Sequence, residues 1–435
     1  MTSRTRLVAL AGCLFIILSS NMRAQEGQLP FRTAIELALK NSATSGIAAA
    51  DQERARAGYH QVRDLFTPQI TLGSGLAFSY GFPLSLEGSA PSVFNVNAQQ
   101  YLFNQAQQQF AKAAKNERAT TEALNADRRN DVMMEAAIDY MQLDLLQSSL
   151  HVQLEEQEFA ARFEDIVNQR VQSGLDSQVD LNRAKLASAK VRLQLTQTKS
   201  AMDQLRLRLS QLTGLPVASI QTSTETIPPL PPVPVDQDLI ALALSKNPVV
   251  KEASLTAQTK MFRAIGEEKQ LYPSLDLVAQ YSVLARYNNY DAFFRKFQRH
   301  NVTLGVAIRF PILNSSQRAV AEAAKADALK AQKEAQNAKD QVSSETLKLQ
   351  RSVQELSAAR DVSRLEHQVA DTDVTATHEK IQSGAATLKD EQSARVAEHD
   401  RYVAYIDSVF QLDKTQVQLL RQTGDLENWA LGPKH

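Results

Sequence analysis

The feature that most constrains this chain is a long stretch without glycine or proline. It runs from Gln105 to Ser173, is interrupted at Gly174, and continues to Thr213. Because glycine and proline are the residues that most readily end helices, the stretch predicts a helical hairpin that turns at Gly174. At 1.5 Å per residue the first helix would extend about 100 Å, several times the usual helix length. Such a helix cannot fold inside one ordinary globule, so we expect an elongated body.

The same layout returns 210 positions later in the chain. A second uninterrupted run begins at Ser315, and its breaks at Gly384 and Gly424 correspond to Gly174 and Gly214. A repeat of about half the chain indicates an internal duplication rather than a solenoid of short repeats. We therefore predict two copies of one structural unit.

The two predicted repeats are residues 25–227 and residues 235–435. A proline-rich segment, residues 228–234, separates them. Such a segment favours an extended polyproline conformation, which would act as a semi-rigid linker. A ligand for a peptide-recognition domain is the alternative interpretation of the same segment.

The N-terminus has the pattern of a secretory signal peptide. Arg4 and Arg6 precede an apolar run over residues 7–18, and polar residues then lead to Ala24. A basic region, a short apolar run and a small residue are the parts of an export signal. We therefore predict that residues 1–24 are removed on export.

Cys13 is the only cysteine of the chain. Its context also matches a lipoprotein signal, so lipidation at Cys13 is an alternative to simple cleavage after Ala24. After cleavage near Ala24 the mature chain has no cysteine, which excludes a disulfide framework and thiol catalysis.

Before the first long run, the sequence predicts one amphipathic helix. Thr33 and Glu36 have the spacing of a capping box, and the alanine-rich pattern continues toward Leu65. Gly46 and Gly58 are the expected weak points of this helix.

Four segments alternate between apolar and polar residues, as strands with one apolar face do. Each spans about 11 to 13 residues, which suits a tilted strand crossing a bilayer, where about 9 to 11 are needed. The edge of a soluble β-sandwich is the alternative. Four strands cannot close a barrel by themselves, so closure would require several chains. The apolar positions are Ile70, Leu72, Leu76, Phe78 and Tyr80; Phe94, Val96, Ala98 and Leu102; Leu275, Leu277, Ala279, Tyr281 and Val283; and Val302, Leu304, Val306, Ile308 and Phe310.

Charge and motif content argue against several function classes. The formal net charge is zero and the charges are mixed along the helices, so no basic surface for nucleic acid is expected. The seven histidines are scattered without metal-ligand spacing, and the sequence contains no phosphate-binding glycine loop or nucleophile motif. We therefore expect neither an enzyme nor a bound metal or cofactor.

Several short motifs occur in an order that resembles the TolC-type outer-membrane efflux protein (outer-membrane factor) family. Residues 37–41 (LALKN) and 243–248 (ALSKNP) resemble the openings of the family's two repeats. Residues 172–177 (QSGLDS) and 382–387 (QSGAAT) resemble the two turns at the periplasmic tip, and residues 212–214 (LTG) resemble the end of the following helix. The resemblance covers nearly the whole mature chain.

The resemblance implies a mainly α-helical fold with a membrane β-barrel. Three chains would each contribute four strands to a twelve-stranded barrel, which duplicated helical hairpins would continue as an α-barrel through the periplasm. The homotrimer would lie in outer-membrane lipid and work with a periplasmic adaptor (membrane fusion) protein and an inner-membrane transporter. Its function would be that of a passive conduit for small-molecule efflux or type I protein secretion. An exported coiled-coil scaffold or adaptor without a pore is the alternative.

The resemblance also implies the functional residues. Asp390 matches a family position that bears a pore-lining carboxylate, so Asp390 and its counterpart Asp180 are candidates for a pore constriction. Both acids also fit helix capping boxes, which is the purely structural interpretation. The family's aromatic and arginine near the second turn are replaced here by Ile381 and Ala386, so its latch cannot be transferred. The expected adaptor contacts are Gly174, Leu175, Asp176, Ser177, Gly384, Ala385, Ala386 and Thr387.

Overall fold

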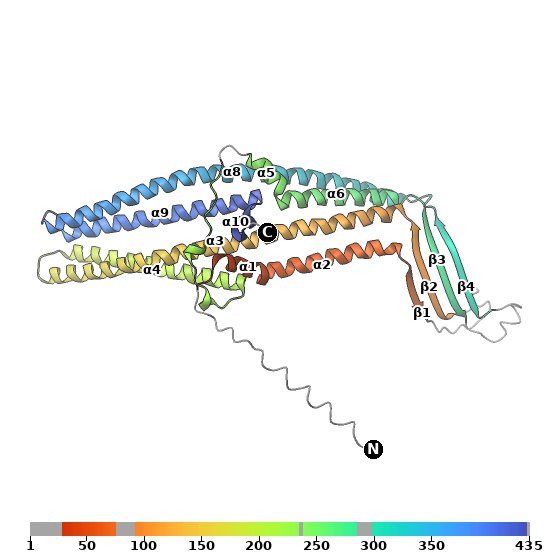
Figure 1. The fold of residues 1–435 in the computed structure, drawn as a ribbon, viewed down its shortest axis with the longest axis horizontal. Helices are drawn as coiled ribbons and strands as arrows, with labels where there is room; N and C mark the ends of the chain where they lie inside the picture. Colours follow the sequence, from red (N-terminus) through yellow and green to blue (C-terminus); the bar gives the residue numbers. More distant parts are fainter. Residues whose placement is uncertain (1–27, 75–91, 235–237, 285–297, 433–435) are drawn as a thin grey trace, which may run out of the picture.

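The structure is a computed structural model that describes residues 28–74, 92–234, 238–284 and 298–432. The predicted signal peptide with Cys13 lies outside these residues, as do the predicted strand positions 76–80. The described chain is elongated, with long helices at one end and a sheet at the other (Figure 1).

The two predicted hairpins are present with matching dimensions. Helices α3 (Gln105–Gln172) and α8 (Ser315–Gln382) each contain 68 residues, and α4 (Gln178–Thr213) and α9 (Leu388–Thr423) each contain 36. The offset of 210 positions read from the sequence therefore holds at the start and end of every one of these helices.

Local chemistry explains where the long helices begin and end. The side chain of Asn104 caps α3 by accepting a hydrogen bond from the backbone of Gln107 at 3.0 Å, and Asn314 caps α8 in the same way through Gln317 at 2.9 Å. The shorter helices end at Gly214 and Gly424, whose φ angles are 74° and 77°. Glycine adopts this left-handed conformation without the steric penalty that a side chain brings.

The first predicted helix is divided in two, and its expected boundaries are corrected. Helix α1 spans Phe31–Asn41 and α2 spans Ala43–Arg63, so the break falls at Ser42, while the expected weak points Gly46 and Gly58 lie within α2. Ser42 has an extended backbone, and its hydroxyl accepts a hydrogen bond from the Ser45 amide at 3.2 Å. Because Ser42 caps the start of α2, the predicted helix breaks at this residue.

The start of α1 is also corrected, because its N-cap is Pro30 rather than Thr33. The second repeat divides similarly: α5 (Leu239–Lys246) and α6 (Pro248–Lys269) meet at Asn247, whose side chain caps α6.

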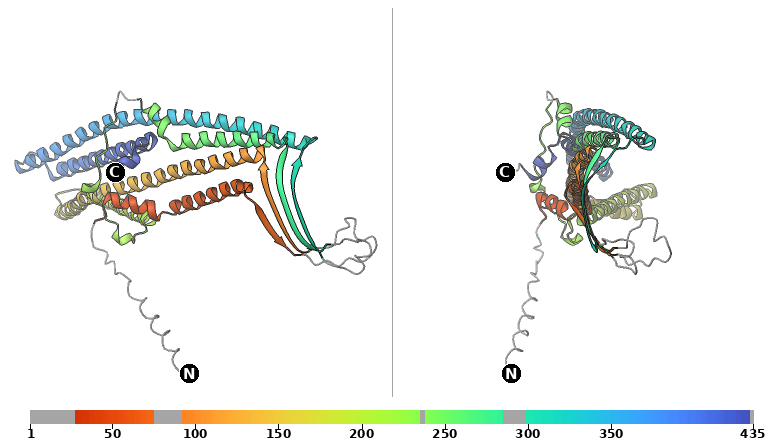
Figure 2. Two further views of the ribbon diagram at one scale, coloured as in Figure 1. Left: turned by 45° about the vertical axis from the view of Figure 1, so that its right-hand side comes forward. Right: turned by 90° about the vertical axis from the view of Figure 1, so that its right-hand side faces the viewer.

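The helices form an extended layer whose partners change along its length. Near the sheet, α3 packs between α2 and α6, and α6 packs against α8. Toward the far end, α4 pairs with α3 and α9 pairs with α8, while α3 also contacts α9. The left view in Figure 2 shows the hairpins extending away from the sheet.

The largest apolar core lies near the middle of the molecule. Tyr140 of α3 is fully buried there, and its ring meets Phe31 edge-to-face with centroids 5.3 Å apart. The Tyr140 hydroxyl donates to the carbonyl of Leu29 at 2.5 Å and accepts from the amide of Ser223 at 2.8 Å. A buried tyrosine needs such polar partners, so this residue fixes the connecting segments against the first hairpin.

Short elements complete the described helices. These are the 3₁₀ turns η1 (Asp64–Phe66), η2 (Val217–Ser219) and η3 (Thr224–Thr226), and helix α10 (Leu426–Leu431). Trp429 of α10 donates from its indole nitrogen to the carbonyl of Pro228 at 3.2 Å. The start of the proline-rich segment is therefore tied to the C-terminal helix.

The four strands form one antiparallel sheet in the order β1-β2-β3-β4. Their bounds are Gln69–Gly73 for β1, Ser92–Phe103 for β2, Ser274–Leu284 for β3 and His300–Arg309 for β4. Strands β1 and β4 form the edges of this sheet, so each leaves one side without a strand partner among the described strands.

The register separates polar from apolar side chains. One row of paired residues across the four strands contains Thr71, Asn97, Gln280 and Thr303. The adjacent row contains Leu72, Val96, Tyr281 and Val302. Because successive residues of a strand point to opposite faces, one face is polar and the other apolar. Val302 and Leu304 are 73% and 74% exposed, so the apolar face is uncovered in the single chain.

None of the helices formed by the described residues is both long enough and apolar enough to cross a membrane.

Candidate functional site at the hairpin tips

The turn of the first hairpin is a well-formed helix C-terminus. Gly174 has a φ of 71°, its amide donates to the carbonyl of Val171 at 3.0 Å, and the Leu175 amide donates to the carbonyl of Arg170 at 2.8 Å. These two bonds are those of a Schellman motif. The turn leaves Leu175 68% exposed at the end of the molecule.

The turn of the second hairpin repeats this backbone geometry. Gly384 has a φ of 75°, its amide donates to the carbonyl of Ile381 at 3.0 Å, and the Ala385 amide donates to the carbonyl of Lys380 at 2.7 Å. The backbones of the two tips are therefore equivalent.

The side chains of the two turns differ. Asp176 accepts two hydrogen bonds from Arg170, at 2.7 Å from Nε and 3.0 Å from Nη2. These bonds hold the pKa of the Asp176 carboxyl below its usual value. Ala385 and Ala386 stand in the second turn, so its surface is small and uncharged where the first has an ion pair.

Both predicted capping boxes are present. Ser177 Oγ accepts from the Asp180 amide at 3.2 Å while Asp180 Oδ2 accepts from the Ser177 amide at 3.4 Å. In α9, Thr387 Oγ1 accepts from the Asp390 amide at 3.4 Å and Asp390 Oδ2 accepts from the Thr387 amide at 2.8 Å. Each box satisfies helix amides that would otherwise lack a partner.

Both capping acids are held in the ionised form. Hydrogen bonds from Ser177 and then Lys389 lower the pKa of Asp180. Hydrogen bonds from the side chain and backbone of Thr387 lower the pKa of Asp390. Asp180 is half-buried and Asp390 is exposed, so Asp390 presents the more accessible charge.

An ion pair that the sequence analysis missed joins the two tips. Lys389 Nζ of α9 lies 3.2 Å from Asp180 Oδ1 of α4. The residues are 209 positions apart, so no local pattern could have indicated the contact. What brings them together is the packing of the two repeats.

The same region contains a groove of about 770 Å³ between the hairpins. Phe163 and Ile166 of α3 and Leu388 of α9 contribute apolar surface, and the Asp180–Lys389 pair contributes charge. The tip therefore offers turns, a groove and paired charges on one surface.

Farther from the tips, a polar layer separates the hairpins. Glu156 of α3 and His399 of α9 are both buried, and His399 Nε2 lies 3.2 Å from Gln194 Oε1 of α4. Burial raises the pKa of Glu156, with Arg395 opposing the effect, and burial lowers the pKa of His399. Both groups are therefore shifted toward their neutral forms by loss of contact with water.

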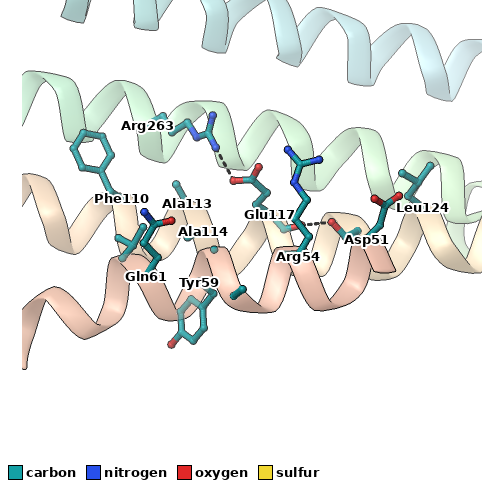
Figure 3. A pocket seen from close by; sticks show the side chains of 15 residues that line it. Asp51, Arg54, Tyr59, Gln61, Phe110, Ala113, Ala114, Glu117, Leu124 and Arg263 are labelled. Atoms are coloured by element: carbon teal, nitrogen blue, oxygen red, sulfur yellow. Dashed lines mark hydrogen bonds and ion pairs between the residues drawn. The ribbon is translucent and has the colours of Figure 1, made fainter. Parts of the chain in front are cut away.

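A second cavity, of about 940 Å³, lies near the sheet between α2, α3 and α6 (Figure 3). Figure 3 shows Arg263 of α6 directed toward Glu117 of α3, and their Nη2 and Oε2 atoms are 2.5 Å apart. Asp51 of α2 pairs with Arg128 of α3 at 2.6 Å. These ion pairs connect the three helices, so this cavity belongs to the helix packing.

Among the described residues, no group of three or more metal-ligating side chains is found at either cavity or elsewhere.

Long helical hairpins that continue into a small sheet with one polar and one apolar face define the fold of this chain. Residues 34–215 match the family model described as outer membrane efflux protein. This match covers somewhat less than half of the chain and agrees with the family that the motifs resemble. A comparison with curated proteins found no match.

Solved outer-membrane proteins share the fold over nearly the whole chain. The CmeC outer membrane channel of Campylobacter jejuni is similar with a TM-score of 0.77 at 16% identity, covering 91% of this chain and 86% of that chain. The outer membrane protein VceC of Vibrio cholerae has a TM-score of 0.74 at 19% identity, covering 90% and 96%. The MtrE outer membrane channel of Neisseria gonorrhoeae has a TM-score of 0.72 at 14% identity, covering 94% and 93%.

At these identities the structural likeness establishes the fold, and it confirms the predicted combination of long helices with a contribution to a β-barrel.

Proposed function

We propose that this chain is the outer-membrane channel of a tripartite export system. It is a passive, trans-periplasmic conduit for small-molecule efflux or type I protein secretion, without a catalytic site of its own. The observation that carries the proposal is the sheet, whose polar face can line water while its apolar face, with Val302 73% and Leu304 74% exposed, meets lipid. The hairpins continue from this sheet into the periplasm.

The proposed channel is a homotrimer. Strands β1 and β4 are the edges of the four-stranded sheet, and unpaired edges must be satisfied in a membrane. Pairing β1 of one chain with β4 of the next closes twelve strands when three chains take part. The two repeats, residues 25–227 and 235–435 with their linker 228–234, then supply the helical part of the same assembly.

The proposed partner surface is the tip. The turn residues Gly174 to Ser177 and Gly384 to Thr387 form the end of the molecule that is farthest from the sheet, as Figure 1 shows for the ends of α3 and α8. A periplasmic adaptor protein contacts this surface and connects it to an inner-membrane transporter. The transporter supplies the energy.

Asp390 is proposed to narrow the pore at this end. Three copies would place three ionised carboxylates around the axis, where they attract cations. Its exposure and its lowered pKa support this role, while its hydrogen bonds to Thr387 support the capping interpretation equally.

Single-channel recordings in planar bilayers separate these two roles of Asp390. The Asp390→Asn channel should lose cation preference, whereas the Asp180→Asn channel, altered at the matching cap, should keep it. Equal small losses of stability in both variants with unchanged selectivity would leave both acids as caps only.

The conduit itself is tested by purification from outer membranes and reconstitution. Light scattering should give a trimer in detergent, and planar bilayers should show discrete conductance steps. A detergent-independent monomer in the periplasm that conducts nothing would instead indicate the exported scaffold.

A further inference from the structure

Formal charge is almost absent from the sheet. Within strands β1 to β4 as the structure describes them, the residues with a permanent charge are Asp276 on β3 and Arg309 on β4. They are not scattered, because Arg309 Nη2 lies 3.2 Å from Asp276 Oδ2. Apart from this ion pair, the described strands carry no permanently charged side chain.

The register places this pair on the polar face. Asp276 stands opposite Tyr101 of β2 and Ala307 of β4, and Arg309 lies two residues beyond Ala307 on the same side of the strand. The row belongs to the alternation that also contains Gln280 and Thr303. The ion pair therefore faces the lumen in the proposed trimer.

The pair also lies at the helical end of the sheet. Strand β3 begins at Ser274, shortly after α6, and β4 ends at Arg309, shortly before α8 begins at Ser315. Solutes that leave the helical conduit would enter the barrel at this level.

The two charges are unequally accessible. The Asp276 side chain is 0% exposed, and both of its oxygens are buried without a hydrogen bond from any described residue. The Arg309 side chain is 62% exposed. A buried carboxylate depends on its partner cation, so the guanidinium is retained beside it while its outer nitrogens face water. The pair is a dipole with its positive end toward the lumen.

We propose that Arg309 determines charge selectivity at the entrance to the barrel. Three copies present a ring of three guanidinium groups that attracts anionic solutes, carboxylates and phosphates in particular. Asp276 positions the guanidinium and weakens its field. This inference rests on the proposed function, because the ring exists only if three chains close around a lumen.

Reversal potentials of the reconstituted channel under a KCl gradient test the proposal. Surface charge in a confined lumen produces potentials on the order of kT or more, so Arg309→Gln should lower the chloride-to-potassium permeability ratio by about twofold or more. Asp276→Asn should raise the ratio, because the guanidinium keeps its charge and loses its counter-ion. A purely structural role would not produce shifts of opposite sign.

The double variant Asp276→Asn/Arg309→Gln guards against misfolding, since it leaves no uncompensated buried charge. It should conduct, and its chloride-to-potassium permeability ratio should lie below that of the wild type but above that of Arg309→Gln, which keeps the Asp276 charge. Thr303→Asn, an uncharged exchange on the same face, is the control and should leave the ratio unchanged. Measuring each variant also in combination with Asp390→Asn separates the effect of Arg309 on the reversal potential from the effect of the acids at the tip.

The outcomes distinguish the selectivity role of Arg309 from the proposed function of the chain as a conduit. Conducting channels whose reversal potential is the same in the wild type, the double variant and Asp276→Asn would overturn the selectivity role and leave the conduit intact. Failure of the wild-type trimer to form any conductance would overturn the proposed function, and this inference with it.

Discussion

Lys389 and Asp180 connect the two halves of the duplicated chain at its far end. The Lys389 ammonium nitrogen lies 3.2 Å from Asp180 Oδ1, although 209 positions separate the residues in the sequence. Asp180 also makes a second contact, because its other oxygen, Oδ2, accepts a hydrogen bond from the Ser177 amide and so closes the capping box. One carboxylate therefore joins a helix start to the neighbouring hairpin.

We predict that Lys389→Gln loosens the tip. Exposed ion pairs are weak, so the change in open probability of the reconstituted channel should be on the order of twofold. Because salt screens exposed charges, the difference from the wild type should disappear between 0.1 M and 1 M KCl. Lys185→Gln, at an exposed lysine of α4, is the control. A difference that persists in high salt would contradict this explanation.

The capping boxes predict local rather than global effects. Ser177→Ala and Thr387→Ala each remove a side chain that accepts a hydrogen bond from a helix amide. Amide hydrogen exchange in the first turn of α4 or α9 should accelerate about fivefold in the matching variant. Ser173→Ala is the comparison, since the Ser173 hydroxyl only donates to the carbonyl of Gln169. Equal acceleration by all three substitutions would remove the caps as the cause.

The ion pair between Arg208 and Asp139 predicts a larger effect on stability. Asp139 of α3 is fully buried, and Arg208 of α4 donates to it from Nε at 2.8 Å and from Nη2. Arg208→Gln leaves a buried carboxylate without its cation and should lower the free energy of unfolding by about 3 kcal/mol. The double variant Asp139→Asn/Arg208→Gln should lose less, as measured by chemical denaturation in detergent. An equal loss in the double variant would show that packing, rather than the stranded charge, is responsible.

Asp413 of α9 predicts a pH dependence of stability. Burial raises its pKa from 3.8 to about 6, with Arg360 opposing the effect. The folded chain therefore binds this proton more tightly than the unfolded chain, so the free energy of unfolding falls as pH rises through about 6. The full effect across pH 4 to 7 is up to about 3 kcal/mol.

The variant Asp413→Asn lacks this ionisation. Its advantage over the wild type should be small near pH 4 and should grow toward pH 7, which thermal unfolding followed by circular dichroism can measure. Parallel stability curves for the two proteins would contradict the assignment.

The sequence predicted the long elements well because their ends are decided locally. Gly174, Gly214, Gly384 and Gly424 adopt left-handed conformations where the hairpins turn or end. The alternation in the strands likewise follows directly from the pleat. Both patterns can be recognised in a single sequence.

The break at Ser42 was missed because it depends on a choice between local signals. Gly46 and Gly58 weaken a helix by roughly 1 kcal/mol each, which packing can overcome. Ser42 instead supplies a cap, and the Asn41 side chain donates to the carbonyl of Thr213 at 2.6 Å, far along the chain. A contact with the end of another helix therefore reinforces the break.

The charged contacts of the candidate sites could not be predicted from the sequence either. The turn residues and both capping acids were found from local motifs. Lys389 with Asp180 and Arg309 with Asp276 form pairs only after the hairpins and strands have packed. The sequence indicates which residues are charged, and the fold decides which of them meet.

The equal lengths of the two hairpins have a consequence for symmetry. Because α3 matches α8 and α4 matches α9 in length, a trimer of this chain presents six turns of the same backbone shape. Their surfaces alternate, since Leu175 and Asp176 occupy one turn and Ala385 and Ala386 the other. The rim of the proposed trimer would thus be pseudo-hexagonal in shape but threefold in chemistry. A six-membered partner would have to bind two kinds of site in alternation around it.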